Sequence, residues 1–91
     1  MDAVAEVRAF VMAIPAGSVA AYGEIGRALG IGPRQVGRAV SLLGDDVPWW
    51  RVVRADGTAA SCRGGGARAL LEAEGVPFRG AHVDMTKTQN A

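Results

Sequence analysis

Hydrophobic residues recur every three or four positions between Asp2 and Ile14, and the positions between them hold mostly alanine or charged residues. This spacing predicts an amphipathic helix over residues 2–14, capped at its start by Asp2. A turn at 15–17 and a short extended segment at 18–20 are expected to follow. The apolar face of the helix would consist of Val4, Val7, Phe10, Val11 and Ile14.

Two further helices are predicted on either side of a tight glycine-containing turn. The first spans residues 22–29 and ends at Gly30, which suits the left-handed conformation that closes many helices. The second begins at Pro33 and runs to about Leu43, where Gly44 ends it. Its core face would hold Val36, Val40 and Leu43, and its outer face Arg34, Arg38 and Ser41. The pattern is typical of a helix-turn-helix, although short helix pairs also occur without that function.

The C-terminal half contains shorter elements. Residues 50–53 favour an extended segment, and Asp56-Gly57 favours a hairpin-type turn. Three segments should follow: a glycine-rich loop over 59–66, a short helix over 67–74 closed by Gly75, and an extended return over 76–83. We therefore predict a mainly α, winged helix-turn-helix-like single domain with a short β element over residues 1–85, and a disordered tail over residues 86–91.

Length and composition bound the class of protein. The chain has 91 residues, of which 49% are hydrophobic, as expected for one small globular domain with one core. No apolar run approaches the roughly 18 residues of a membrane span, and no secretory signal is visible. These features favour a cytoplasmic protein without a membrane partner.

The chain offers few residues for metal binding or acid–base catalysis. Its single cysteine, Cys62, rules out an internal disulfide framework and a cysteine-rich zinc site. Its single histidine, His82, lies in a different segment, so spacing gives no support for a Cys–His dyad. We expect neither a metal nor a cofactor.

Charge is unevenly distributed although the net charge is only +1. Between Gly26 and Leu70 the chain has seven arginines and three acidic residues. Arginine suits phosphate because its planar fork donates paired hydrogen bonds. Charge alone fits nucleic-acid binding and a solvated arginine-rich surface equally well.

Four ordered motifs carry a resemblance to a known family. They are Ile14-Pro15-Ala16-Gly17-Ser18-Val19, Tyr22-Gly23-Glu24-Ile25, Arg34-Gln35-Val36-Gly37 and Pro48-Trp49-Trp50-Arg51-Val52. Together they resemble the DNA-binding domain of the O6-alkylguanine-DNA alkyltransferases, whose active-site motif reads Pro-Cys-His-Arg-Val. Here Trp49 stands at the position of the alkyl-accepting cysteine and Trp50 at that of the histidine. The chain is thereby similar to the alkyltransferase-like proteins, which bind damaged DNA and do not repair it.

The resemblance implies DNA contacts on the helix-turn-helix. Arg34 would enter the duplex and fill the gap that a flipped base leaves, because a flat cation can stack there. Tyr22 would press on the phosphate 3′ of the target nucleotide, and Gly37 would let the helix approach the minor groove. The alternatives are an exposed helix arginine, a core tyrosine and close helix packing at Gly37. The predicted DNA contacts are Tyr22, Arg34, Gln35, Gly37, Arg38 and Ser41.

The resemblance also implies a lesion pocket made of Val40, Trp49, Arg51, Val53 and Arg63. Trp49 would offer an aromatic face to a purine, a contact worth roughly 1–3 kcal/mol in single-strand binders. A plain core tryptophan is the alternative at this position. Arg51 is expected to brace the surrounding structure as well, and Trp50 to pack behind the pocket.

Catalysis is not expected. An indole cannot replace a thiolate nucleophile, so alkyl transfer is excluded at Trp49. Glu74 matches the glutamate that ends the proton relay of the active enzymes, but Trp50 leaves it no relay to serve. Glu74 would then merely bind the backbone.

We therefore expect a monomeric, non-enzymatic sensor that binds O6-alkylguanine in double-stranded DNA, flips the damaged base into the Trp49 pocket and flags it for nucleotide excision repair proteins. Bound to DNA, it would be nucleoid-associated. The alternatives are a helix-turn-helix transcription regulator indifferent to alkylation, a residual enzyme such as a glycosylase or an alkyltransferase using Cys62, and a protein-interaction module that has lost DNA binding.

Overall fold

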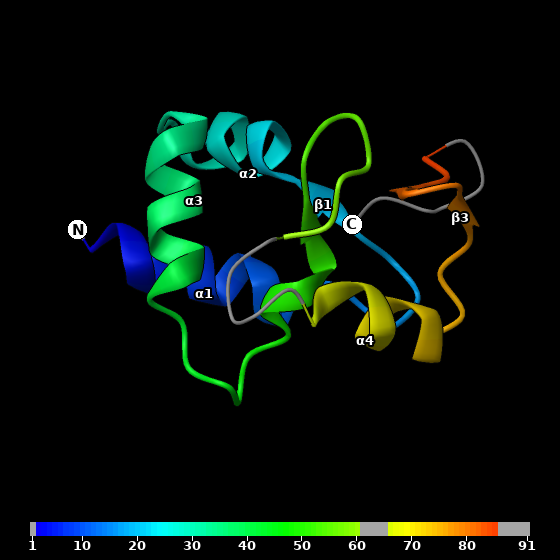
Figure 1. The fold of residues 1–91 in the computed structure, drawn as a ribbon. Coiled ribbons are helices and arrows are strands. Elements are labelled where there is room, and N and C mark those ends of the chain that lie inside the picture. The colour runs from blue at the N-terminus through cyan, green and yellow to red at the C-terminus, as the bar shows by residue number, and fades with distance from the viewer. Residues whose placement is uncertain (1, 61–65, 86–91) are drawn as a thin grey trace.

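The computed structural model describes residues 2–60 and 66–85 (Figure 1). Helices α1 to α3 pack together at one end of the domain, and α4 and the β3–β4 hairpin lie at the other. The predicted mainly helical fold with short strands is confirmed. The elements are α1 (Ala3–Met12), β1 (Ala20–Ala21), α2 (Tyr22–Leu29), α3 (Pro33–Ser41), the 3-10 turn η1 (Trp49–Arg51), β2 (Val52–Val53), α4 (Ala67–Ala73), β3 (Phe78–Arg79) and β4 (His82–Val83).

Within residues 2–60 and 66–85, no helix is both long enough and apolar enough to cross a membrane. The disordered tail predicted over residues 86–91 lies outside the described part of the chain.

Helix α1 starts as predicted and ends two residues early. The Asp2 carboxylate accepts a hydrogen bond from the Val4 amide at 3.0 Å and so caps the helix. The amides of Ala13 and Ile14 donate to carbonyls three residues back, at 3.1 and 3.0 Å, which tightens the last turn. Pro15 follows and disfavours the helical conformation at the residue before it. The predicted end at Ile14 is therefore wrong, although Ile14 remains buried in the core.

The turn between α2 and α3 depends on glycine. Helix α2 has the predicted bounds, and Gly30 closes it with a φ of 74°. The Ile31 amide donates to the Gly26 carbonyl at 2.9 Å, which folds the chain back on the helix. A Cβ at Gly26 would lie 2.6 Å from the carbonyl oxygen of Ile31, so no side chain fits there. This close approach fixes the start of α3.

Helix α3 begins at Pro33 as predicted, and the Gln35 side chain caps it by accepting from the Gly32 amide at 2.9 Å. Its predicted end near Leu43 is wrong, because α3 stops at Ser41. The Ser41 hydroxyl donates to a backbone carbonyl three residues back at 2.6 Å, and the following amides make the same short-range pattern. The predicted core face is confirmed, with Val36, Val40 and Leu43 buried.

The prediction of an extended segment over residues 50–53 is correct only for its second half. Residues 49–51 form η1, in which the Arg51 amide donates to the Pro48 carbonyl at 3.1 Å. Only β2 is extended, and it pairs in parallel with β1, with Ala20 opposite Val52. The tight turn sends successive side chains of η1 in different directions, so that Trp49 enters the core while Arg51 reaches α4.

The predicted turn at Asp56-Gly57 is confirmed. The Arg54 amide donates to the Thr58 carbonyl at 3.0 Å, and Gly57 has a φ of 91°. The Gly57 carbonyl accepts from the Val83 amide at 2.9 Å, so the β3–β4 hairpin is fastened to this turn. A Cβ on Gly57 would lie 2.5 Å from the Val83 carbonyl oxygen, which makes glycine necessary here. The predicted helix before Gly75 and the return over 76–83 correspond to α4 and the hairpin.

The hydrophobic core consists of two clusters of buried side chains. One lies among α1, α2, α3 and the residues around η1, and includes Trp49. The other lies between β1, β2, α4 and the hairpin, and includes Leu71 and Val83. Trp50 and Ala59 pack against both clusters, so they join the helical end to the hairpin end.

Candidate nucleic-acid interface

An open cleft of about 510 Å³ separates the helix-turn-helix from the segment that follows β2. Its size is within the range of about 300–1,000 Å³ that is usual for ligand sites. Two arginines and a phenol are its polar side chains, and among the described residues no acidic side chain lines it. One wall consists of Tyr22, Gly23, Pro33, Arg34 and Gly37, and the other of Arg54, Ala55 and Ala60. Such a cationic hollow suits a phosphate backbone.

Three of the predicted DNA contacts meet in this cleft. Arg34 is exposed in the first turn of α3, as a residue that reaches out to DNA must be. Tyr22 opens α2 and is half-buried, since its ring packs against the core while part of it lines the cleft. Gly37 lies one helical turn after Arg34 on the same wall.

Helix packing does not explain the glycine at position 37. A Cβ built there would meet only Tyr22, whose Cε1 atom would lie 3.9 Å away, an ordinary van der Waals distance. This differs from Gly26, where a side chain would strike backbone. Gly37 therefore leaves open space at the cleft wall rather than a tight helix contact.

The other three predicted contacts lie outside the cleft. Gln35 and Arg38 line a second hollow of about 230 Å³ between α1 and α3, next to Leu42. The Gln35 amide oxygen caps α3, and the Ser41 hydroxyl is bonded to the Arg38 carbonyl. These side chains are exposed. Their contact with DNA stays a prediction.

Arg54 is the cleft residue that sequence reasoning missed. It follows β2 directly, and its position in a cleft depends on the turn that brings Ala60 back beside it. The arginine-rich composition of this region was its only signal in the sequence, and that signal does not distinguish one arginine from another.

The residues predicted for the lesion pocket are mostly buried. Trp49 is 6% exposed and meets the Trp50 ring edge-on, with 5.8 Å between ring centroids. Val40 and Val53 are buried as well, and none of the three is among the described residues that line the cleft. Arg63 and Cys62 lie outside the described residues. A pocket formed by these residues stays a prediction.

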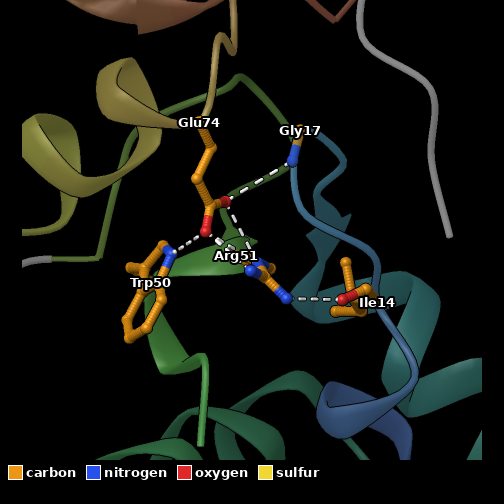
Figure 2. Close-up of polar contacts among 5 residues, drawn as sticks. All are labelled: Ile14, Gly17, Trp50, Arg51 and Glu74. Atoms are coloured by element: carbon orange, nitrogen blue, oxygen red, sulfur yellow. Dashed lines mark hydrogen bonds and ion pairs between the residues drawn. The ribbon is translucent and has the colours of Figure 1, made fainter.

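Arg51 and Trp50 both bind the carboxylate of Glu74 (Figure 2). The Arg51 guanidinium donates to it at 3.0 Å from Nε and 2.6 Å from Nη2, and the Trp50 indole N–H donates at 3.1 Å. The Gly17 amide adds a longer contact of 3.5 Å. Arg51 also donates from Nη1 to the carbonyl of Ile14 at 2.7 Å. Glu74 thus connects η1 and the turn after α1 to the end of α4. The sequence suggested only that Glu74 binds the backbone.

This carboxylate is held in its ionised form. Both members of the Arg51–Glu74 pair have side chains that are only 15% exposed. Hydrogen bonding from Arg51, with a smaller contribution from Trp50, keeps the pKa of Glu74 below its ordinary value of 4.5, although burial opposes the shift. Glu74 is therefore a fixed anion at neutral pH.

The arrangement can position groups but provides no nucleophile at the motif. An indole N–H is a donor only, so Trp50 can bond to Glu74 but cannot take up a proton in the physiological range. Within residues 2–60 and 66–85 there is no group of three or more His, Cys, Asp or Glu side chains that could hold a metal ion.

The fold and the cleft define a small helix-turn-helix DNA-binding domain. The model of the family described as 6-O-methylguanine DNA methyltransferase, DNA binding domain, matches residues 2–76, and the chain belongs to this family. The resemblance inferred from the four motifs is thereby confirmed.

Solved structures give the same assignment. The chain is similar to S. pombe Atl1 in complex with damaged DNA containing O6-carboxymethylguanine, with 36% identity and a TM-score of 0.74 over 85% of this chain and 79% of that chain. It is also similar to S. pombe ATL in complex with DNA, with 37% identity and a TM-score of 0.73 over 84% and 78%. For Mycobacterium tuberculosis O6-methylguanine methyltransferase the values are 33% and 0.72, over 94% of this chain and 54% of that chain. Comparison with curated proteins gave no match.

Proposed function

We propose that this protein is a non-enzymatic sensor of alkylated DNA. It binds O6-alkylguanine in duplex DNA through the minor groove, turns the damaged base out into a pocket that includes Trp49, and marks the lesion for nucleotide excision repair. The observation that carries the proposal is the cleft that joins Tyr22 and Arg34. The motif resemblance adds that Trp49 stands at the position of the nucleophile.

Binding to damaged DNA is supported by the relatives and by the charge of the cleft. Both S. pombe structures are complexes with DNA, and one contains O6-carboxymethylguanine. In this chain the cleft offers an exposed Arg34 beside Tyr22 and the open space at Gly37. An arginine in this place can stack in the duplex and bond the orphaned base.

The absence of alkyl transfer is supported by the two tryptophans. Transfer to the protein needs a thiolate, and Trp49 supplies none. The Trp50 indole occupies Glu74 as a hydrogen-bond donor and offers no basic nitrogen. A protein that binds the adduct and leaves it in place can mark the lesion for other proteins.

The binding mode is tested with Arg34→Ala and a matched control, Arg79→Ala, which removes an exposed arginine of β3 outside the cleft. Duplexes carrying O6-methylguanine or guanine at one position are titrated at fixed salt. We expect Arg34→Ala to abolish most of the preference for the lesion while the thermal unfolding curve is retained. The control should keep the preference. Equal preference in wild type and Arg34→Ala would contradict the proposal.

One observation favours a second function. Arg38, Gln35 and Ser41 are exposed on α3 away from the cleft, where a recognition helix could read base edges in the major groove. A transcription regulator of this kind would prefer one unmodified sequence and would bind alkylated and plain duplexes equally. Selection from a pool of random duplexes separates this function from the first.

A further inference from the structure

Arg54 lies on the cleft wall formed by Arg54, Ala55 and Ala60, and none of the predicted DNA contacts is on that wall. Its backbone is fixed from both sides of the turn, because its amide donates to the Thr58 carbonyl at 3.0 Å and its carbonyl accepts from the Gly57 amide at 2.9 Å. Gly57 is in turn fastened to the β3–β4 hairpin through Val83. An exposed side chain thus projects from a rigid anchor into an open cleft.

The charge of Arg54 is available to a ligand. Among the described residues, Arg8, Arg51 and Arg68 each form an ion pair with a carboxylate, and no ion pair involves Arg54. Arg54 interacts electrostatically with Asp56, but that carboxylate accepts two hydrogen bonds from Thr58, at 2.6 and 2.9 Å. Arg54 makes only the smallest contribution to lowering the pKa of Asp56, after Thr58 and His82.

The two arginines of the cleft cannot do the same work once DNA is bound. In the proposed function Arg34 enters the base stack, so its guanidinium leaves the cleft. The strand that lies along the cleft brings its phosphates with it, and Arg54 then supplies the remaining cationic side chain of the described walls. Ala55, Ala60 and Gly23 beside it carry no bulk that would keep a sugar–phosphate backbone away.

We infer that Arg54 binds a backbone phosphate of the strand that carries the damaged nucleotide, an inference that rests on the proposed function. The planar guanidinium would donate two hydrogen bonds to the phosphate oxygens. Such a contact strengthens binding to any duplex and does not itself read the lesion. Arg54 is thus a positioning residue that holds the strand while Arg34 and Tyr22 act on the nucleotide.

The test is the salt dependence of binding to plain duplex for wild type, Arg54→Gln and the matched Arg79→Gln. The slope of log affinity against log salt is negative, and each lost phosphate contact makes it shallower by about 0.9. We expect this change for Arg54→Gln. The factor by which its affinity falls between about 50 and 200 mM salt should be roughly three- to fourfold smaller than for wild type. Arg79→Gln should keep the wild-type slope, and Arg54→Lys should keep most of it. Equal slopes for wild type and Arg54→Gln would overturn the inference.

A second arm locates the phosphate. Single phosphates around O6-methylguanine are replaced in turn by neutral methylphosphonate. At one position on the damaged strand, the neutral substitution should lower the affinity of wild type but not that of Arg54→Gln. Equal losses of affinity in both proteins at every position would overturn the inference. The lesion preference of wild type tests the proposed function separately, because the slope on plain duplex does not depend on it.

Discussion

The Glu74 carboxylate accepts hydrogen bonds from Arg51, Trp50 and the Gly17 amide, and replacing it gives a quantitative test. In Glu74→Gln the volume is kept, but the 2.6 Å ion pair with Arg51 is lost and the amide cannot accept all the N–H groups that now converge on it. Arg51 keeps its bond to the Ile14 carbonyl, and its guanidinium is left without a counter-ion in a site where it is 15% exposed.

The expected cost follows from that partial burial. Hydrogen bonds to charged groups contribute about 1.5–3 kcal/mol, and breaking a fully buried pair costs about 3–5 kcal/mol. Because both side chains retain some exposure, we expect Glu74→Gln to lower the free energy of unfolding by about 2–3 kcal/mol. For a domain of this size that corresponds to a decrease in Tm of about 10–20 °C.

The matched control is Glu72, which lies in α4 two residues before Glu74. Glu72 pairs with Arg68 at 3.5 Å, but their side chains are 53% and 44% exposed. Glu72→Gln should therefore change the free energy of unfolding by less than about 0.5 kcal/mol. Both variants are measured by urea denaturation at pH 7 with wild type alongside. Equal effects of the two substitutions would refute the conclusion that the partly buried Arg51–Glu74 pair stabilises the fold more than an exposed pair does.

Three further predictions follow from the same contacts. Because the pKa of Glu74 is lowered in the folded state, its contribution is present above the ordinary value of 4.5 and lost as pH falls through the folded value, so the stability gap between wild type and Glu74→Gln should narrow on acidification; a constant gap would contradict this. Trp50→Phe keeps an aromatic ring but removes the donor to Glu74, so urea denaturation should show a loss of about 1 kcal/mol; unchanged stability would mean that the bond contributes nothing. Gly37→Ala should raise helix stability by about 0.5–1 kcal/mol and weaken DNA binding, since the methyl group meets Tyr22 at an ordinary distance but narrows the cleft; a destabilised variant would restore the helix-packing explanation.

The helix-turn-helix could be predicted because its signals are local. Hydrophobic spacing, the Asp2 cap, Gly30 and Pro33 each act within a few residues, and the structure follows them closely. The predicted helix ends were less accurate, since Ser41 terminates α3 through its own hydroxyl before Gly44 is reached. Such competition between a side chain and the helix is not visible in hydrophobic spacing.

The remaining features depend on contacts between distant segments. Val52 is extended because it pairs with Ala20, and no local sequence pattern predicts that parallel pairing. The bond from Trp50 to Glu74 spans 24 positions, and the cleft position of Arg54 arises only when the turn after β2 faces the helices. The family motifs indicated which residues belong together, but the partner of each side chain required the fold.

The central claim is that the protein recognises the lesion and leaves it intact. Its most direct test is an equilibrium titration at fixed salt with duplexes containing O6-methylguanine, a bulkier O6-alkylguanine or guanine, followed by recovery of the DNA and mass analysis of the adduct and the protein. A base contact with an aromatic pocket, worth about 1–3 kcal/mol, predicts roughly 5- to 150-fold tighter binding to the lesion. We expect this preference with the adduct fully recovered and the protein mass unchanged. Equal binding to all three duplexes, or transfer of the alkyl group, would contradict it.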